Sequence, residues 1–403
     1  MRCAPSVERV LVLPRSLAGL QTRLRPGRAV LLFAILVLLT GSFSRADDAA
    51  DRLTLAVDAL TRLEGIDLQA NPAMKERVLL VLAKTRGTAN FVRLVRHFSL
   101  PDQDPGLLDV AVALPKDEYG VEAIRMLLAD GRTNLLAATL AMGGPSAVAL
   151  AEALGNSGQR DAVKVLLPAL SPAKANLTNV NAGTAELQNQ IVRSLTRSAD
   201  GARQLLALAQ ADQLKEPLRK TALDELAQVH WETIKADALK LRGQSDVKMP
   251  AMSELVKMSG NRERGQSVFF RASPGCFNCH VVHGKGTDLG PNLSEIGGKL
   301  AREALFQAIL EPSAGISFGF EAFTVTLRDG DEAYGLIASE TATELALKTV
   351  GGVVARYKKS EIASRQKSTL SLMPAGLEAG LTPQEMVDLV EFLSSLKKGT
   401  GSE

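Results

Sequence analysis

The chain has 403 residues, of which 46% are hydrophobic, 23% charged and only 4% aromatic. This composition excludes a disordered or low-complexity protein, and the abundance of Leu and Ala favours helices. The formal net charge is +3, but residues 1–46 hold seven Arg and one Glu, so the remainder carries 40 basic and 43 acidic residues. Without a basic excess in its body, the chain is not expected to have a nucleic-acid partner.

The N-terminal residues have the order of a secretory signal peptide. Six arginines precede the apolar run Ala29–Leu39, and Ser44 and Ala46 are small residues in front of a cleavage point. We predict a cleaved signal peptide over residues 1–46 and a periplasmic or otherwise exported protein. The alternative is an uncleaved anchor, which would be the only link to a membrane. The apolar run is shorter than the roughly 20 residues that a spanning helix needs.

Residues 47–258 are predicted to form successive amphipathic helices, because apolar residues recur there at helical spacing. Stretches that show this spacing are 77–83, 121–128, 162–167 and 216–226. Breaks are expected at Gly87, Pro101, Pro105, Gly131, residues 143–145, Gly155, residues 171–172 and Gly243.

A weak repeat runs through this helical region. Stretches 82–92, 154–163 and 195–205 each combine a helix end, a short polar turn and the start of a new helix. The pattern resembles HEAT-like repeats, so we predict a HEAT-like helical repeat solenoid with a structural or docking role. An irregular helical bundle is the alternative. His97 and His230 are given no role, and Trp231 is interpreted as a core residue.

The motif that carries chemistry is Cys276-Phe-Asn-Cys279-His280, a C-x-x-C-H sequence typical of c-type haem attachment. Two thiols one helical turn apart can add to the two vinyl groups on one side of a porphyrin. The histidine that follows then lies beneath the iron as its proximal ligand. We therefore predict one covalent haem c, bound through Cys276 and Cys279, with His280 as an axial ligand.

The C-x-x-C-H motif has three alternative interpretations. A zinc site would need four separated ligands, and no second C-x-x-C exists in the sequence. A thioredoxin-like pair should lie at a strand-to-helix turn of a βαβ unit, and no such unit flanks Cys276. A further alternative is that the motif, which fixes three positions in five, occurs by chance.

The flanking residues resemble those of class I cytochromes c. Stretch 260–270 is similar to their first helix, and stretch 284–293 to their Gly-rich loop. Thr382-Pro-Gln-Glu385 is a capping box that opens a terminal helix with apolar Met386, Leu389, Val390, Leu393 and Leu396. The resemblance implies that the Pro291 carbonyl accepts the N–H of His280, and that Gly265 and Phe269 meet Phe392 where the two helices cross.

A low-spin electron carrier needs a second axial ligand, and a thioether sulfur favours Fe(II). Met373 precedes a proline in a loop before the last helix, where class I cytochromes c carry their distal methionine, and we predict it as the second ligand. The alternative for any methionine is core filler, which we assign to Met249, Met252, Met258 and Met386. His283, one turn from His280 on the same side, is not expected to reach the opposite face of the haem.

Residues 318–362 separate the haem motif from Met373 and are not helical in pattern. Alternating stretches at 323–327, 333–338, 345–349 and 353–357 predict about four strands. We expect a small SH3-like β-barrel or meander inserted into the cytochrome c-like domain. Its role could be to shield the haem or to dock a partner.

Residues 259–397 as a whole resemble the haem-binding domain of the PVC-type haem-binding CxxCH proteins, and residues 398–403 form a tail. The matching stretches are 276–280, 290–297, 309–316, 319–321, 329–330, 335–336, 361–362 and 371–377. The preceding helices look like the HEAT-like segment that these proteins often carry. No run of regularly spaced β blades precedes residue 259, so the dehydrogenase activity of propeller-bearing relatives is not implied.

The predicted fold is thus mainly α. The predicted function is that of an exported monohaem c-type cytochrome. It would transfer single electrons between a periplasmic dehydrogenase and a respiratory acceptor, with the helical repeats as docking scaffold. We expect an electron carrier and not an enzyme, because one haem motif stands without a catalytic constellation. The alternatives are a haem-based sensor and a single-haem peroxidase-like enzyme.

Overall fold

The computed structural model describes residues 46–63, 65–170, 182–243, 249–271 and 274–398. The predicted leader lies outside the described residues except for Ala46, as does the tail beyond Lys398. The predicted break at residues 171–172 also falls outside them. None of the described helices is long and apolar enough to cross a membrane.

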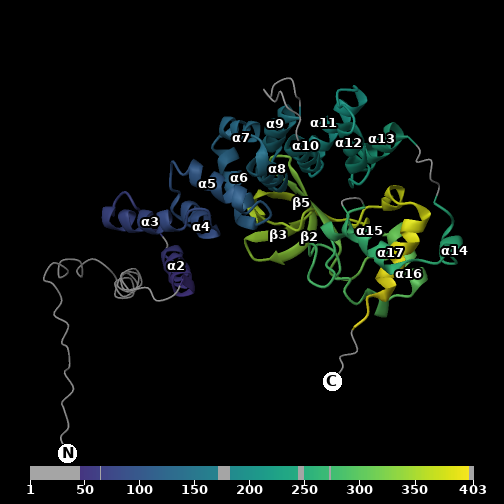
Figure 1. Ribbon diagram of the computed structural model, residues 1–403. Helices are drawn as coiled ribbons and strands as arrows, with labels where there is room; N and C mark the ends of the chain where they lie inside the picture. The colour runs from purple at the N-terminus through teal and green to yellow at the C-terminus, as the bar shows by residue number, and fades with distance from the viewer. Residues whose placement is uncertain (1–45, 64, 171–181, 244–248, 272–273, 399–403) are drawn as a thin grey trace, which may run out of the picture. The chain divides into compact units, whose positions relative to one another are not determined.

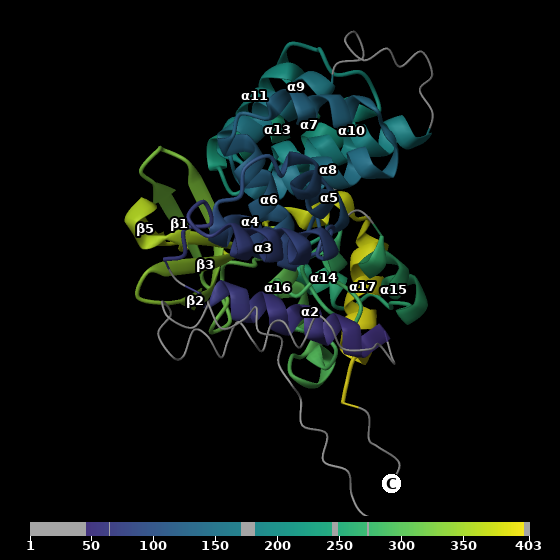
Figure 2. The same ribbon diagram turned by 90° about the vertical axis from the view of Figure 1, so that its left-hand side faces the viewer.

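The described residues are mainly helical and include one small antiparallel sheet, so the predicted mainly-α class is confirmed. Helices of the first half follow one another with short connections (Figures 1 and 2). They are α2 (Ala46–Thr61), α3 (Pro72–Lys84), α4 (Ala89–Phe98), α5 (Asp104–Ala113), α6 (Glu118–Ala129), α7 (Thr133–Ala141), α8 (Gly144–Ser157), α9 (Arg160–Ala169), α10 (Ala182–Leu195), α11 (Ala199–Gln210), α12 (Leu218–Leu226) and α13 (Glu232–Arg242).

The chain forms two compact units. One comprises Met1–Arg86 with Arg93–Asp102, and the other comprises Gly87–Val92 with Gln103–Glu403. This division falls inside the helical region and not between residues 258 and 259. All residues discussed below as a candidate site belong to the second unit.

Most helix boundaries follow local sequence signals. Asn71 caps α3 by accepting a hydrogen bond from the Met74 N–H, and Ser198 caps α11 by accepting one from the Gly201 N–H. The predicted breaks at Gly87, Gly131 and Gly243 fall between or at the ends of helices, as expected. Helix α12 begins at Leu218 and not at the predicted Glu216. Its cap is Pro217, a residue excluded from helix interiors.

Gly155 is not the predicted break but lies inside α8. A Cβ at this position would lie 2.5 Å from the Cβ of Ser194 on α10. The missing side chain therefore lets α8 and α10 approach closely, and the Ser194 hydroxyl donates to the Ala151 carbonyl across the contact. The helix ends instead before Gly158, which has a φ of 66°.

The helices of the C-terminal third are α14 (Met252–Leu255), α15 (Arg262–Phe270), α16 (Arg302–Leu310) and α17 (Pro383–Ser395). Short 3₁₀ turns are η2 (Cys276–Asn278), η3 (Ile296–Gly298), η4 (Lys359–Glu361) and η5 (Leu377–Gly380). The predicted capping box of α17 is present, with Thr382 and Glu385 as the reciprocal pair. The five apolar residues predicted to face the core from this helix are all buried.

Helices α15 and α17 cross in close contact. A Cβ at Gly265 would lie 1.9 Å from the Asp388 carbonyl oxygen and 2.8 Å from the Cβ of Phe392. The rings of Phe269 and Phe392 lie with centroids 5.7 Å apart. The expected meeting of Gly265 and Phe269 with Phe392 is therefore confirmed. Only a glycine permits backbone contact at this distance.

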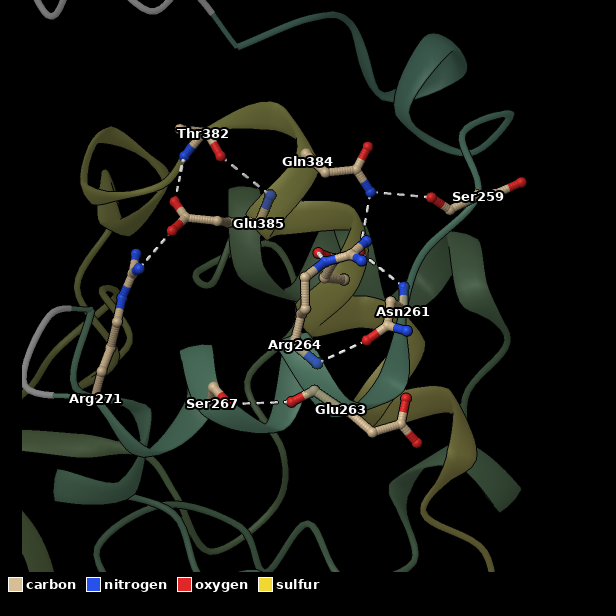
Figure 3. A network of polar contacts seen from close by, with 10 residues as sticks. Ser259, Asn261, Glu263, Arg264, Ser267, Arg271, Thr382, Gln384 and Glu385 are labelled. Carbon is tan, nitrogen blue, oxygen red and sulfur yellow. Dashed lines mark hydrogen bonds and ion pairs between the residues drawn. The ribbon is translucent and has the colours of Figure 1, made fainter.

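A polar network ties the same two helices together (Figure 3). Arg264 donates two hydrogen bonds to the Asp388 carboxylate, at 2.6 and 2.9 Å, and the backbone N–H of Asn261 donates a third. Burial alone would raise the pKa of Asp388, but these donors and Gln384 outweigh it and lower the pKa. Asp388 is therefore an ionised carboxylate inside the crossing.

The strands are β1 (Ala322–Leu327), β2 (Glu332–Glu340), β3 (Glu344–Thr349), β4 (Val354–Lys358) and β5 (Ile362–Lys367). They form one antiparallel sheet in the order β4-β3-β2-β1-β5. The prediction of about four strands ending at residue 362 missed β5, which pairs with β1 beyond that boundary. Strand β5 is mostly exposed and lacks the apolar alternation on which the prediction depended. This strand order gives an open meander, in which β5 returns to pair with β1, rather than a closed barrel.

The sheet contacts both the helices of the second unit and a loop of the C-terminal third. Arg125 of α6 donates to the Tyr357 hydroxyl at 3.0 Å, and Arg356 of β4 donates to Glu118 at 2.7 Å. Lys348 of β3 donates to Asp288 at 2.7 Å. The sheet therefore links the helices of the second unit to the loop that follows the C-x-x-C-H motif.

Candidate haem-binding site

The C-x-x-C-H motif forms a single helical turn. Gly275 precedes it with a φ of 72°, and η2 starts at Cys276. The N–H groups of Cys279 and His280 both donate to the Cys276 carbonyl, at 3.2 and 3.0 Å. The two thiols and the imidazole thus belong to one short hydrogen-bonded segment, whose sequence is typical of c-type haem attachment.

Both cysteines have apolar surroundings. Cys276 and Met373 pack against the core of α15, α16 and α17, while Cys279 and Leu372 pack against a second cluster of Leu289, Ala322 and Leu336. Burial raises the pKa of Cys276 to about 12 and that of Cys279 to about 11. Both side chains are therefore neutral thiols at neutral pH.

His280 is oriented by Pro291, as the resemblance to class I cytochromes c implies. Its Nδ1 lies 2.8 Å from the Pro291 carbonyl oxygen. Because a carbonyl oxygen only accepts, Nδ1 carries the proton and the lone pair of Nε2 is left for a metal. Burial lowers the pKa of His280, with the bond to Pro291 opposing the shift, which keeps the imidazole neutral as a metal ligand must be.

The imidazole of His280 lies directly against the backbone of Gly290. A Cβ at Gly290 would lie 2.6 Å from Cε1 and 2.9 Å from Nδ1 of the ring. The Gly290 N–H also donates to the Cys279 carbonyl at 2.6 Å. The sequence predicted a Gly-rich loop around Gly290 but no role for this glycine. Its position directly before Pro291 is the feature that could have indicated the close approach to His280.

Met373 lies half-buried in the loop before η5, with its N–H donating to the Ser371 hydroxyl at 3.2 Å. The Ser371 N–H donates in turn to the Ser313 hydroxyl at 3.0 Å. Cys276 and Met373 pack against one apolar cluster, and their chain neighbours Cys279 and Leu372 pack against the other. The motif and the Met373 loop therefore border the same two clusters.

The remaining methionines differ in their surroundings. Met386 is completely buried, and Met249 and Met258 pack against the same core. Met252 is 39% exposed, so its interpretation as core filler is wrong. It lies in the four-residue helix α14, of which only Leu255 is buried.

His283 does not lie one helical turn from His280. The chain leaves the helical segment and makes a tight turn from Val282 to Lys285, where His283 has a φ of 48°. Its N–H donates to the Ser294 hydroxyl at 2.8 Å. Glycines at 284 and 286, also with positive φ, make this reversal possible and override helical continuation.

Residues without an assigned role gather beside Cys279. Tyr334 of β2 packs against the same apolar cluster as Cys279. The ring of His230 stacks on the Tyr334 ring, with the two ring centroids 3.9 Å apart. The ring centroids of Trp231 and His230 lie 4.1 Å apart, and Trp231 is half-buried, not a core residue. Burial lowers the pKa of His230 to about 4, so it is neutral. In the other unit, the Nε2 of His97 lies 3.1 Å from the Leu63 carbonyl oxygen, which is a structural contact.

The residues present fit a c-type haem. The neutral thiols, the imidazole with Nε2 left for a metal, the glycine backbone against the ring and the apolar lining match what the cofactor requires. Within the described residues, no group of three or more His, Cys, Asp and Glu side chains is arranged to hold a metal ion, which a zinc site would need. The chain matches no protein-family model, and no curated protein matches it.

Proposed function

We propose that residues 259–397 form a cytochrome c-like domain that binds one covalent haem, and that the protein is an exported monohaem c-type electron carrier. The observation that carries this proposal is the 2.8 Å contact between His280 Nδ1 and the Pro291 carbonyl within a C-x-x-C-H turn. It supplies the protonation and orientation that a proximal histidine needs, from a residue eleven positions away. The resemblance to PVC-type haem-binding CxxCH proteins supports the same conclusion.

Each residue of the site has a distinct task in this proposal. Cys276 and Cys279 would hold the porphyrin through thioether bonds, and His280 would bind the iron through Nε2. The haem would supply one-electron chemistry at its iron. Met373 would be the second ligand, and the buried core against which it packs would exclude water from its side chain.

Helices α5–α13 serve, in the same proposal, as HEAT-like docking scaffold. Their short lengths and their succession without an intervening strand among the described residues support a repeat architecture. The sheet joins them to the haem loop through Arg125, Arg356 and Lys348. The redox partners are a periplasmic dehydrogenase and a respiratory acceptor, which the scaffold would hold near the haem.

The proposal is tested on the full chain exported by a host with haem-attachment machinery. We expect the pyridine haemochrome to report one covalent haem per chain, and the oxidised spectrum to show the weak far-red band of methionine–ferric ligation. Replacing both Cys276 and Cys279 with Ala should abolish covalent attachment. Absence of covalent haem in the unaltered protein would overturn the proposal.

A pair of methionine variants tests the second ligand. Met373→Leu should remove the far-red band and lower the midpoint potential, because the thioether favours Fe(II). Met252→Leu, at an exposed methionine in the same domain, should preserve both. Covalent haem that lacks the band in the unaltered protein would exclude Met373 and favour a sensor or a peroxidase. Substrate oxidation by the isolated protein would contradict an electron carrier.

A further inference from the structure

Hydrogen bonds from near and distant residues hold the loop that carries Met373. Met373 is half-buried, its N–H donates to the neighbouring Ser371 hydroxyl, and the Ser371 N–H donates to the Ser313 hydroxyl. The loop reaches from the end of β5 at Lys367 to the start of η5 at Leu377. Its conformation therefore depends on groups from other parts of the chain.

The C-terminal side of this loop is bound by a helix far away in sequence. Lys235 of α13 donates from Nζ to the Ala375 carbonyl at 3.0 Å, across 140 residues. Ala375 is the second residue after Met373. The helical part of the second unit thus contacts the loop directly beside the proposed ligand (Figure 1).

The N-terminal side of the loop is bound through Tyr334. Its hydroxyl lies 3.4 Å from the Ser368 hydroxyl and 3.5 Å from the Leu370 carbonyl oxygen. The ring is held from the helical side by His230, which stacks on it nearly parallel, at an interplanar angle of 15°. His230 precedes α13, so the attachments through Tyr334 and Lys235 both lead back to the same short stretch of the chain, while a third, from the Ser371 N–H to the Ser313 hydroxyl, leads elsewhere.

We propose that His230, Lys235 and Tyr334 are positioning residues that hold the loop carrying Met373, the proposed second ligand of the haem iron. The helical scaffold thereby controls axial ligation as well as docking. This inference rests on the proposed function. A thioether is a weak, neutral ligand that an added imidazole can displace, so the stability of the loop enters directly into the competition between the two. Loss of one hydrogen bond from the loop shifts such a competition by about five- to tenfold.

Two variants on one helix separate positioning from general stability. Lys235→Met keeps the aliphatic stem and removes Nζ, while Lys240→Met removes an ammonium group that pairs only locally with Asp237. We expect Lys235→Met to bind imidazole about five- to tenfold more tightly in the ferric state and to lower the midpoint potential. Lys240→Met should leave both unchanged. Equal imidazole affinities for the two variants would overturn the proposal.

Tyr334→Phe provides an independent test. It keeps the ring that stacks on His230 and removes the hydroxyl beside Ser368 and Leu370. Hydrogen exchange of the peptide 368–377 should become faster than in the unaltered protein, while exchange in α15 and α17 stays the same. Unchanged exchange of this peptide, in a protein that shows the far-red methionine band, would contradict the positioning role and leave the proposed function intact. Absence of that band would instead count against Met373 itself.

Discussion

The contact between α8 and α10 and the crossing of α15 and α17 both depend on a glycine, but they use polar groups differently. At Gly155 the neighbour is Ser194, whose Cβ and backbone Cα would lie 2.5 and 2.7 Å from an added Cβ and whose hydroxyl donates to one carbonyl. At Gly265 the neighbour is the backbone of Asp388, whose carboxylate accepts hydrogen bonds from Arg264, Gln384 and Asn261. The approach at Gly265 is closer, because an added Cβ would lie 1.9 Å from the Asp388 carbonyl oxygen. The second contact should therefore tolerate change far less.

The largest effect is expected for Gly265→Leu. The new Cβ would lie 1.9 Å from the Asp388 carbonyl oxygen, so α15 and α17 must separate. We predict a loss of about 3 kcal/mol or more in the free energy of unfolding, together with failure to attach haem. Urea unfolding and the pyridine haemochrome measure the two effects. Gly298→Ala is the matched control, because nothing lies within 4 Å of a Cβ there.

Gly155→Ala should cost less, about 1–3 kcal/mol, since the approach to Ser194 is less close than that of Gly265 to Asp388. Haem attachment should persist, because the contact lies outside the C-terminal third. In the background of Ser194→Gly, which removes the opposing Cβ, the cost of Gly155→Ala should fall. Equal costs in both backgrounds, measured by urea unfolding, would show that the close approach to Ser194 is not the cause.

Gly290→Ala tests the close approach inside the site. Its Cβ would lie 2.6 Å from the His280 ring, which must turn or move away from the Pro291 carbonyl. We predict a modest loss of stability, about 1 kcal/mol, from the strained hydrogen bond. Weakened axial ligation should appear as a shifted haem absorption band. An unshifted band would mean that the ring keeps its place despite the added methyl group.

The smallest effect is expected for Asp388→Asn, and it depends on pH. The folded-state pKa of Asp388 is lowered, so its stabilising contribution is present above the unfolded value near 3.9 and is lost as the pH falls through the folded value. At pH 7 the variant should lose less than about 1 kcal/mol of its free energy of unfolding. The exposure of Arg264 and its screening by solvent keep the figure small. The difference should narrow below pH 4 in urea titrations, and a constant difference would contradict the ionised carboxylate.

Local patterns predicted much of the C-terminal third. The Thr382–Glu385 capping box and the buried face of α17 depend on short spacings that the chain carries wherever it folds. The meeting of Gly265 with Phe392, which lie far apart in the chain, was implied instead by the resemblance to class I cytochromes c. The missed features depend on distant partners. Strand β5 forms because β1 offers it an edge, although its own residues are polar and exposed. Gly155 carries the same local signal as a helix break, and only the neighbouring Ser194 shows that it is a contact.

The sequence by itself determined the local chemistry. It places two thiols and an imidazole on one short segment, with Gly290 and Pro291 in the loop that follows. Only the tertiary structure decided which groups surround that chemistry. The stack of His230 on Tyr334 and the reach of Lys235 to Ala375 span about a hundred residues or more, and no periodicity links such pairs. Their physical basis is the packing of complete helices and strands, which comes about only when the chain has folded.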